Sequence, residues 1–259
     1  MTDEGTLSGF RPAVILVRPQ LGENIGASCR AMLNFGLEHL RIVDPRDGWP
    51  NPSAIAMASG AERILERAQL YATTREALSG LNFVFATTAR TRDMTKNVLS
   101  PRPAMRNARQ MAADGNRVGF LFGPERSGLN NSDVSLADAI VTIPVNPGFR
   151  SLNISQSVLL LAYEWWVAAD ESSCESRPRR NPELMAEFSE VQVLADRLEN
   201  ELSDRGFFSP ESKASRMKRN LRNLLSRMPL TGRDVRTIHG VIRTLTERRP
   251  GSGSHATKR

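Results

Sequence analysis

The chain has 259 residues, of which 40% are hydrophobic. This length allows one domain of roughly 170–200 residues with its own core, plus an appendage. The formal net charge of +7 is unevenly spread, because residues 1–176 carry 17 basic and 18 acidic side chains while residues 177–259 carry 18 and 10. This excess favours a polyanion such as nucleic acid as the partner of the C-terminal third, although a merely solvated charged face would give the same pattern.

Several classes of protein are disfavoured by the sequence. There are two cysteines, Cys29 and Cys174, and no CxxC or His/Cys cluster, which argues against a metal site or a disulfide framework. The N-terminus lacks the basic-then-apolar pattern of a signal peptide. The longest apolar stretch, residues 158–169, contains Glu164 and is shorter than the ~20 residues of a membrane span. We therefore expect a cytoplasmic protein that uses neither a metal nor a membrane.

The first 170 residues alternate short apolar runs with helical patterns, an order that builds a parallel sheet. The predicted strands are 13–18, 40–44, 83–87, 118–122 and 139–143. The predicted helices are 26–35, 53–69, 101–113 and 154–169. The last of these is apolar nearly all round, so we expect it in the core or at a subunit interface.

The C-terminal third has a different composition. Residues 170–182 are rich in Ser, Arg and Pro and are predicted to be a linker between an α/β domain at 1–169 and a helical extension at 183–249. The extension contains a predicted helix near 182–204 and two more helices with ordinary apolar packing stripes. The tail 250–259 is expected to be disordered.

The polar faces of the last two helices are strongly basic. Residues 213–249 hold eleven basic and two acidic side chains, which predicts contacts with phosphates. The candidate RNA-binding residues are Lys213, Arg216, Lys218, Arg219, Arg222 and Arg236.

Three turns carry the side chains that could do chemistry. In the first, residues 24–30, a helix that begins near Gly26 would place Arg30 one turn in, facing the strand ends, with Asn24 near the N-cap. A capped helix with a solvated arginine is the alternative. In the second, residues 122–129, Gly123 would allow close backbone approach of a ligand, whereas Glu125 could simply form a local ion pair.

The third turn, residues 143–153, is stiffened by prolines and ends in Ser151 and Asn153 at a helix start, where backbone donors point outward. It could hold a ligand, or it could be only a rigid, capped connection. No GxGxxG or GxxxxGK[ST] sequence occurs, so ordinary dinucleotide or nucleoside-triphosphate binding is disfavoured.

Taken together, the segments NIGASCR, FGPERSGL and IPVNPGFRSLNIS resemble the three motifs of the SpoU/TrmH family of SPOUT RNA ribose methyltransferases. The resemblance covers about residues 12–169. The C-terminal part is similar, less specifically, to a branch of the family that methylates the ribose 2′-oxygen of nucleotide 32 in the anticodon loop of tRNA.

The resemblance implies a mostly parallel α/β sheet flanked by helices with a C-terminal trefoil knot, plus a small all-helical C-terminal extension. It also implies S-adenosylmethionine as cofactor and a homodimer with its sites at the interface. The implied cofactor-binding residues are Thr87, Thr88, Ala89, Gly123, Ile143, Arg150, Ser151 and Leu152. The implied catalytic residues are Arg30, Asn24, Glu125, Ser151 and Asn153.

The family reading makes Arg30 the base, yet a guanidinium is a very weak acid. Either Arg30 accepts the proton transiently with help from a substrate phosphate, or it stays charged and stabilises the developing alkoxide. Histidine offers little alternative, since the chain has only His39, His239 and His255. A ribosomal RNA methyltransferase and a non-catalytic RNA-binding protein on the same fold remain the competing functions.

Overall fold

In the computed structural model, residues 10–89, 96–172 and 184–246 are described. Seven strands form one sheet in the order β3-β2-β1-β6-β4-β7-β5, and every pair is parallel. The strands are β1 (Ala13–Val17), β2 (His39–Val43), β3 (Gln69–Tyr71), β4 (Phe83–Thr87), β5 (Asn97–Leu99), β6 (Val118–Phe122) and β7 (Ala139–Val141). The predicted parallel α/β fold is confirmed.

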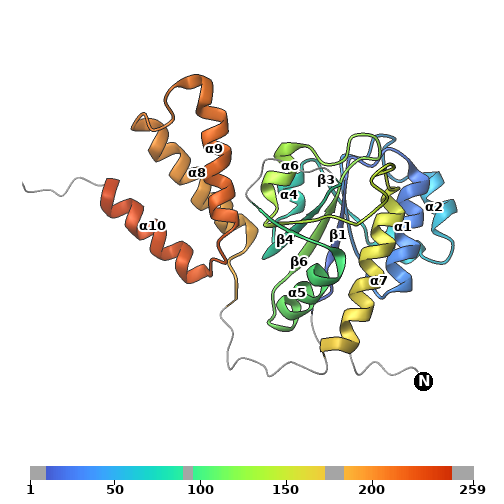
Figure 1. Ribbon diagram of the computed structural model, residues 1–259. Helices are drawn as coiled ribbons and strands as arrows, with labels where there is room; N and C mark the ends of the chain where they lie inside the picture. Colours follow the sequence, from blue (N-terminus) through green and yellow to red (C-terminus); the bar gives the residue numbers. More distant parts are fainter. Residues whose placement is uncertain (1–9, 90–95, 173–183, 247–259) are drawn as a thin grey trace, which may run out of the picture.

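Helices cover both faces of the sheet (Figure 1). They are α1 (Gly22–Asn34), α2 (Pro52–Ala58), α3 (Glu62–Glu66), α4 (Thr74–Ala77), α5 (Pro101–Ala113), α6 (Asn131–Leu136) and α7 (Ile154–Ser172). Successive strand residues point to opposite faces. Val14 and Leu16 of β1 therefore pack in the cluster shared with α1, α5 and α7, while Ile15 packs in the cluster shared with α4 and α6.

The C-terminal region is helical, as predicted, and has a core of its own. Helices α8 (Phe188–Asp204), α9 (Glu211–Ser226) and α10 (Gly232–Thr246) lie beside the sheet domain in Figure 1. Leu194, Leu225 and Ile242 belong to a hydrophobic cluster separate from the two clusters of the sheet. We call α8, α9 and α10 with their connections the helical unit.

One junction between the helical unit and the sheet domain lies at the start of α8. The backbone N–H of Phe188 donates to the carbonyl of Leu81 at 2.6 Å. The Asn82 amide donates to the carbonyl of Met185 at 2.7 Å, and the ring of Phe188 enters a core cluster of the sheet. These contacts fix one end of the helical unit on the sheet domain.

Some predicted boundaries were wrong. The predicted helix 53–69 is broken into α2 and α3 because Ser59 and Gly60 take positive φ angles of 37° and 87°. Helix α1 begins at Gly22 rather than near Gly26. Helix α7 runs on to Ser172, into the predicted linker, and α8 begins only at Phe188.

The sequence analysis also missed short elements. Strands β3 and β5 have three residues each and lie at the two edges of the sheet, where little burial marks the pattern. Helices α4 and α6 are shorter than two turns. The tail 250–259 lies outside the described residues, and the trefoil knot stays a prediction.

Candidate functional site

The main cavity opens where β4, β6 and β7 end, at the carboxyl edge of the sheet. Its volume is about 570 Å³, within the usual range for a small-molecule site. It is lined by Thr87, Thr88, Ala89, Phe122, Gly123, Pro124, Glu125, Arg126, Ser127, Gly128, Ile143, Val145, Arg150, Ser151, Leu152, Ile154 and Ser157. Ligands of open α/β sheets bind at this edge, so the location alone predicts a binding site.

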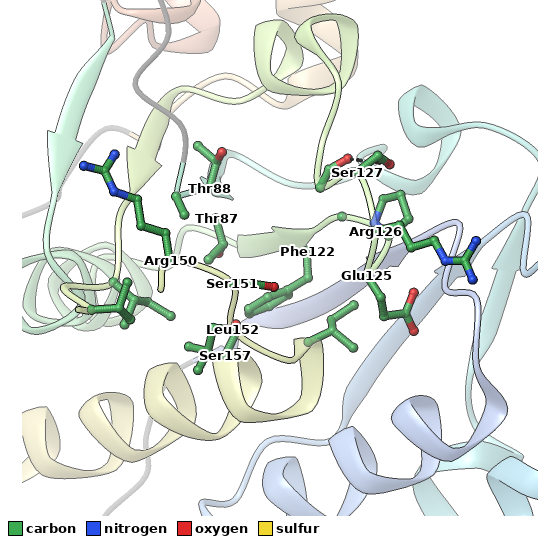
Figure 2. Close-up of a pocket in the computed structure, with 17 residues that line it drawn as sticks. Thr87, Thr88, Phe122, Glu125, Arg126, Ser127, Arg150, Ser151, Leu152 and Ser157 are labelled. Atoms are coloured by element: carbon green, nitrogen blue, oxygen red, sulfur yellow. Dashed lines mark hydrogen bonds between the residues drawn. The ribbon is translucent and has the colours of Figure 1, made fainter. Parts of the chain in front are cut away.

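All eight residues predicted to bind a cofactor line this cavity. Figure 2 shows Arg150 at one end, with Glu125 and Arg126 at the other. Thr87 contributes a buried hydroxyl oxygen that has no hydrogen-bond partner among the described residues. A buried polar atom without a partner is costly, so this hydroxyl is suited to a ligand that supplies one.

Glu125 joins the second turn to the first. Its carboxylate accepts hydrogen bonds from the backbone N–H of Gln20 at 2.8 Å and of Leu21 at 3.3 Å. It also accepts one from the side-chain amide of Asn24 at 2.8 Å. The Glu125 carboxylate therefore holds the loop before α1 and the first turn of that helix.

Asn24 joins the first turn to the third. Its side-chain oxygen accepts a hydrogen bond from the amide of Asn153 at 2.9 Å. Asn153 in turn accepts from the backbone N–H of Ser155 at 2.8 Å, in the manner of an N-cap for α7. The prediction that Asn24 lies near the N-cap was wrong, because α1 begins at Gly22. Asn24 lies within the helix, and its buried side chain links Glu125 to Asn153. The first turn is thus fixed beside the cavity to two turns that lie more than a hundred residues further along the chain.

Close backbone packing explains two glycines in these turns. A Cβ at Gly123 would lie 2.1 Å from the backbone nitrogen of Leu129, so the loop that follows β6 folds back onto the strand end. A Cβ at Gly26 would lie 2.2 Å from the carbonyl oxygen of Ala54, where α2 crosses α1. Gly123 thus shapes the cavity wall through the chain's own loop, and Gly26 lies within a helix rather than at its start.

Arg30 lies away from this cavity. Because α1 begins at Gly22, Arg30 is about 12 Å along the helix axis from that start, on the third turn rather than the first. Its side chain is exposed, does not line the cavity, and makes no hydrogen bond or ion pair with the described residues. The predicted orientation of Arg30 toward the strand ends of its own chain was wrong.

Neither a histidine nor a cysteine lines the cavity among the described residues. His39 and His239 do not line it, and His255 lies outside the described residues. Burial raises the pKa of the Cys29 thiol to about 12, so this residue is not a thiolate nucleophile. Groups of three or more potential metal ligands are absent from the described ranges. Ser157, which the sequence analysis missed, lines the cavity one helical turn beyond Asn153.

The six candidate RNA-binding residues fall into two groups. Lys213, Arg216, Arg219 and Arg236 are exposed on α9 and α10. The other two are engaged within the helical unit: Arg222 bonds to Asp196 at 2.7 Å and to Glu199 at 2.6 Å, and Lys218 lies 3.2 Å from Glu199. None of the helices in the described ranges is both long and apolar enough to cross a membrane.

Comparison with known proteins places these features in one family. Residues 11–163 match the SpoU rRNA Methylase family, and the chain belongs to that family. The chain is 35% identical over 240 residues to a protein of Pseudomonas aeruginosa named tRNA (cytidine/uridine/adenosine-2'-O-)-methyltransferase TrmJ, covering 90% of this chain and 92% of the relative. It is 30% identical to the tRNA (cytidine/uridine-2'-O-)-methyltransferase TrmJ of Salmonella typhimurium, covering 92% and 97%.

A solved structure extends the likeness to the helical unit. The crystal structure of TrmJ from Z. mobilis ZM4 superposes with a TM-score of 0.82 at 45% identity, covering 92% of this chain and 100% of that one. A probable methylase family protein from Haemophilus influenzae Rd KW20 superposes with a TM-score of 0.60 at 25% identity. The whole architecture, and not only the sheet, is therefore shared with TrmJ.

Proposed function

We propose that this protein transfers a methyl group from S-adenosylmethionine to a ribose 2′-oxygen of tRNA, at nucleotide 32 of the anticodon loop. The observation that carries the proposal is the hydrogen-bonded chain Glu125–Asn24–Asn153, which fixes all three motif turns around one cavity. The relatives named TrmJ match nearly the full length of the chain, including the helical unit, which supports tRNA over ribosomal RNA as substrate.

The cavity residues fit the proposed cofactor. The volume of about 570 Å³ suits a molecule of this size, and the unpartnered Thr87 hydroxyl offers a hydrogen bond at the cavity wall. The guanidinium of Arg150 at one end would attract a carboxylate. Bound S-adenosylmethionine would supply an already activated methyl group, so the protein's own residues have to hold the ribose in line and manage the proton of its hydroxyl.

Positioning is the larger part of that task. Holding two reactants in the correct geometry can contribute roughly 7–11 kcal/mol to a rate. Glu125 and Asn24 would act as positioning residues, because they hold the first turn against the third. Ser151 would face the ribose or the cofactor from the third turn. Arg30 would serve the removal of the hydroxyl proton in one of two ways. Either it accepts the proton transiently with help from a substrate phosphate, or it stays charged beside the developing alkoxide while solvent or phosphate takes the proton.

The location of Arg30 leads us to propose that a second copy of the chain supplies it. On α7, Leu159, Leu160, Tyr163 and Trp166 are each 40–46% exposed, an apolar face that a monomer rarely leaves open. Tyr163 packs edge-on against Phe35, just after α1, which carries Arg30. A homodimer that covers this face would bring the Arg30 of each copy toward the other copy's surface.

Subunit mixing tests the shared site. The Arg30→Ala and Asn153→Ala variants are each expected to be inactive, while Arg30→Ala retains cofactor affinity in calorimetry. When the two variants are mixed at random, some dimers contain one copy of each. One site of such a mixed dimer has both an intact cavity and an intact Arg30, so about a quarter of wild-type activity should return. Activity absent from the mixture would contradict an arginine supplied by the partner.

The substrate is tested by mapping 2′-O-methylation by mass spectrometry in RNA from cells with and without the protein. Loss of the modification at tRNA nucleotide 32 is expected. Loss from ribosomal RNA alone would favour the competing methyltransferase. Failure of the purified protein to bind S-adenosylmethionine would favour a non-catalytic RNA-binding protein.

The exposed basic residues test how tRNA is held. Replacing Lys213, Arg216 and Arg219 with alanine should weaken tRNA binding and reduce the slope of log affinity against log salt by about 0.7–0.9 for each lost contact. Cofactor affinity should not change, because the cavity is at the edge of the sheet. An unchanged salt slope would show that tRNA binds elsewhere.

A further inference from the structure

One buried lysine connects the helical unit to the sheet domain at a second place, the end of α9. Lys96, directly before β5, is 6% exposed. Its ammonium donates to the hydroxyl of Ser226 at 2.8 Å, at the last residue of α9. It also donates to the carbonyls of Ser135 and Ala137 at the end of α6. A buried ammonium that lost one of these acceptors would be left incompletely satisfied.

Helix α6 ties this contact to the cavity. Its capping residue Asn130 follows the cavity loop after β6 directly, and the Asn130 and Asp133 side chains form a reciprocal capping box. Asp133 is further held by Thr74 at 2.8 Å and by an ion pair with Arg18 just after β1. Helix α6 is therefore fixed rigidly to the sheet, and the lysine fixes the end of α9 to α6.

Part of the interface around this bond is open. A hollow of about 580 Å³ lies between the sheet domain and the helical unit, lined on one side by Phe83, Phe85 and Asp138 and on the other by residues 224–230. The helical unit keeps its own core, separate from the sheet. Burial lowers the pKa of Lys96 to about 8 despite the nearby Asp138, so the ammonium form still dominates at neutral pH.

We propose that Lys96 is a positioning residue for the tRNA reaction: by holding the end of α9 on α6, it sets where the RNA-binding helices present the substrate ribose to the cavity. The inference rests on the proposed tRNA methylation. It assigns Lys96 no contact with substrate or cofactor. A fault in this contact should therefore impair turnover of bound tRNA more than the binding of tRNA or cofactor.

The Ser226→Ala variant tests this with little disturbance, because it leaves Lys96 on the carbonyls of α6. It removes the bond from Lys96 to α9 and, besides that, the hydrogen bond that the Ser226 hydroxyl donates to the carbonyl of Asn223 at 3.3 Å within α9. A hydrogen bond to a charged group typically corresponds to a factor of about ten or more, so kcat for tRNA should fall about tenfold. The dissociation constants for tRNA and S-adenosylmethionine should stay within roughly twofold of the wild-type values. The kcat of Lys96→Met should fall by at least the same factor. The double variant should lose little more kcat than Lys96→Met alone.

Hydrogen–deuterium exchange gives a readout that needs no activity. Exchange at the end of α9 should rise in Ser226→Ala, while α1 and α7 stay unchanged. Ser132→Ala, an exposed position on α6, is the matched control and should behave as wild type in every assay. Faster exchange with unchanged kcat, or a loss confined to tRNA affinity, would overturn the positioning role. If the wild-type protein failed to methylate tRNA, the proposed function would fail, and unchanged exchange would separately show that Lys96 does not hold α9.

Discussion

Asn24 is the residue whose replacement tests the organisation of the site most directly. Its amide donates to Glu125 at 2.8 Å, and its oxygen accepts from Asn153 at 2.9 Å. The change Asn24→Asp keeps the shape of the side chain but turns the donor into a second carboxylate oxygen. The contact with Asn153 can persist, while the contact with Glu125 becomes repulsive.

The size of the effect follows from the geometry. Two unit charges 2.8 Å apart repel by about 6 kcal/mol at an effective dielectric constant of about 20. Even if movement of the two side chains removes half of this, about 3 kcal/mol remains, which corresponds to roughly a hundredfold loss in kcat/KM. Asn24 is 8% exposed, so solvent offers little further screening.

The assay is the initial rate of methyl transfer to tRNA, with the melting temperature measured alongside it. Asn107→Asp is the matched control, since it places the same charge on an exposed position of α5 and should retain nearly full activity. If Asn24→Asp stayed within threefold of wild type while remaining folded, the hydrogen-bonded chain through Asn24 would not be what organises the site.

Three further predictions concern other parts of the molecule. Gly123→Ala should lower cofactor affinity in calorimetry at least tenfold, because its Cβ would lie 2.1 Å from the backbone nitrogen of Leu129 and the cavity loop would have to move. Arg222→Ala should destabilise the helical unit by about 1–3 kcal/mol in urea denaturation, because Asp196 and Glu199 lose the guanidinium that bonds to both of them. Arg216→Ala should change stability by less than about 0.5 kcal/mol. Burial raises the pKa of Asp138 from 3.8 to about 7. Between those values the folded state holds a proton that the unfolded chain has lost, so the free energy of unfolding should fall as the pH rises from about 4 to about 7. The free energy of unfolding of Asp138→Asn should not fall over this pH range. An equal pH dependence of stability in the wild type and the variant would contradict the prediction.

Local patterns were sufficient to predict much of the fold. Short apolar runs identified β1, β2, β4, β6 and β7, because a buried central strand has consecutive apolar residues. The cofactor-binding residues were implied by the resemblance to family motifs, and they lie around one cavity because the motif turns follow parallel strands that end at one edge of the sheet. Edge strands β3 and β5 carry no such signal, since they are half exposed.

Contacts between distant segments were decided only by the tertiary structure. Glu125 and Asn24 are 101 residues apart in the chain, and their hydrogen bond depends on β6 being inserted beside β1 in the sheet. No local pattern encodes that insertion. The exposed position of Arg30 depends on where α1 starts and on how α2 packs across Gly26. The sequence therefore determined which residues surround the cavity, whereas folding determined which of them hold one another, and left Arg30 facing outward.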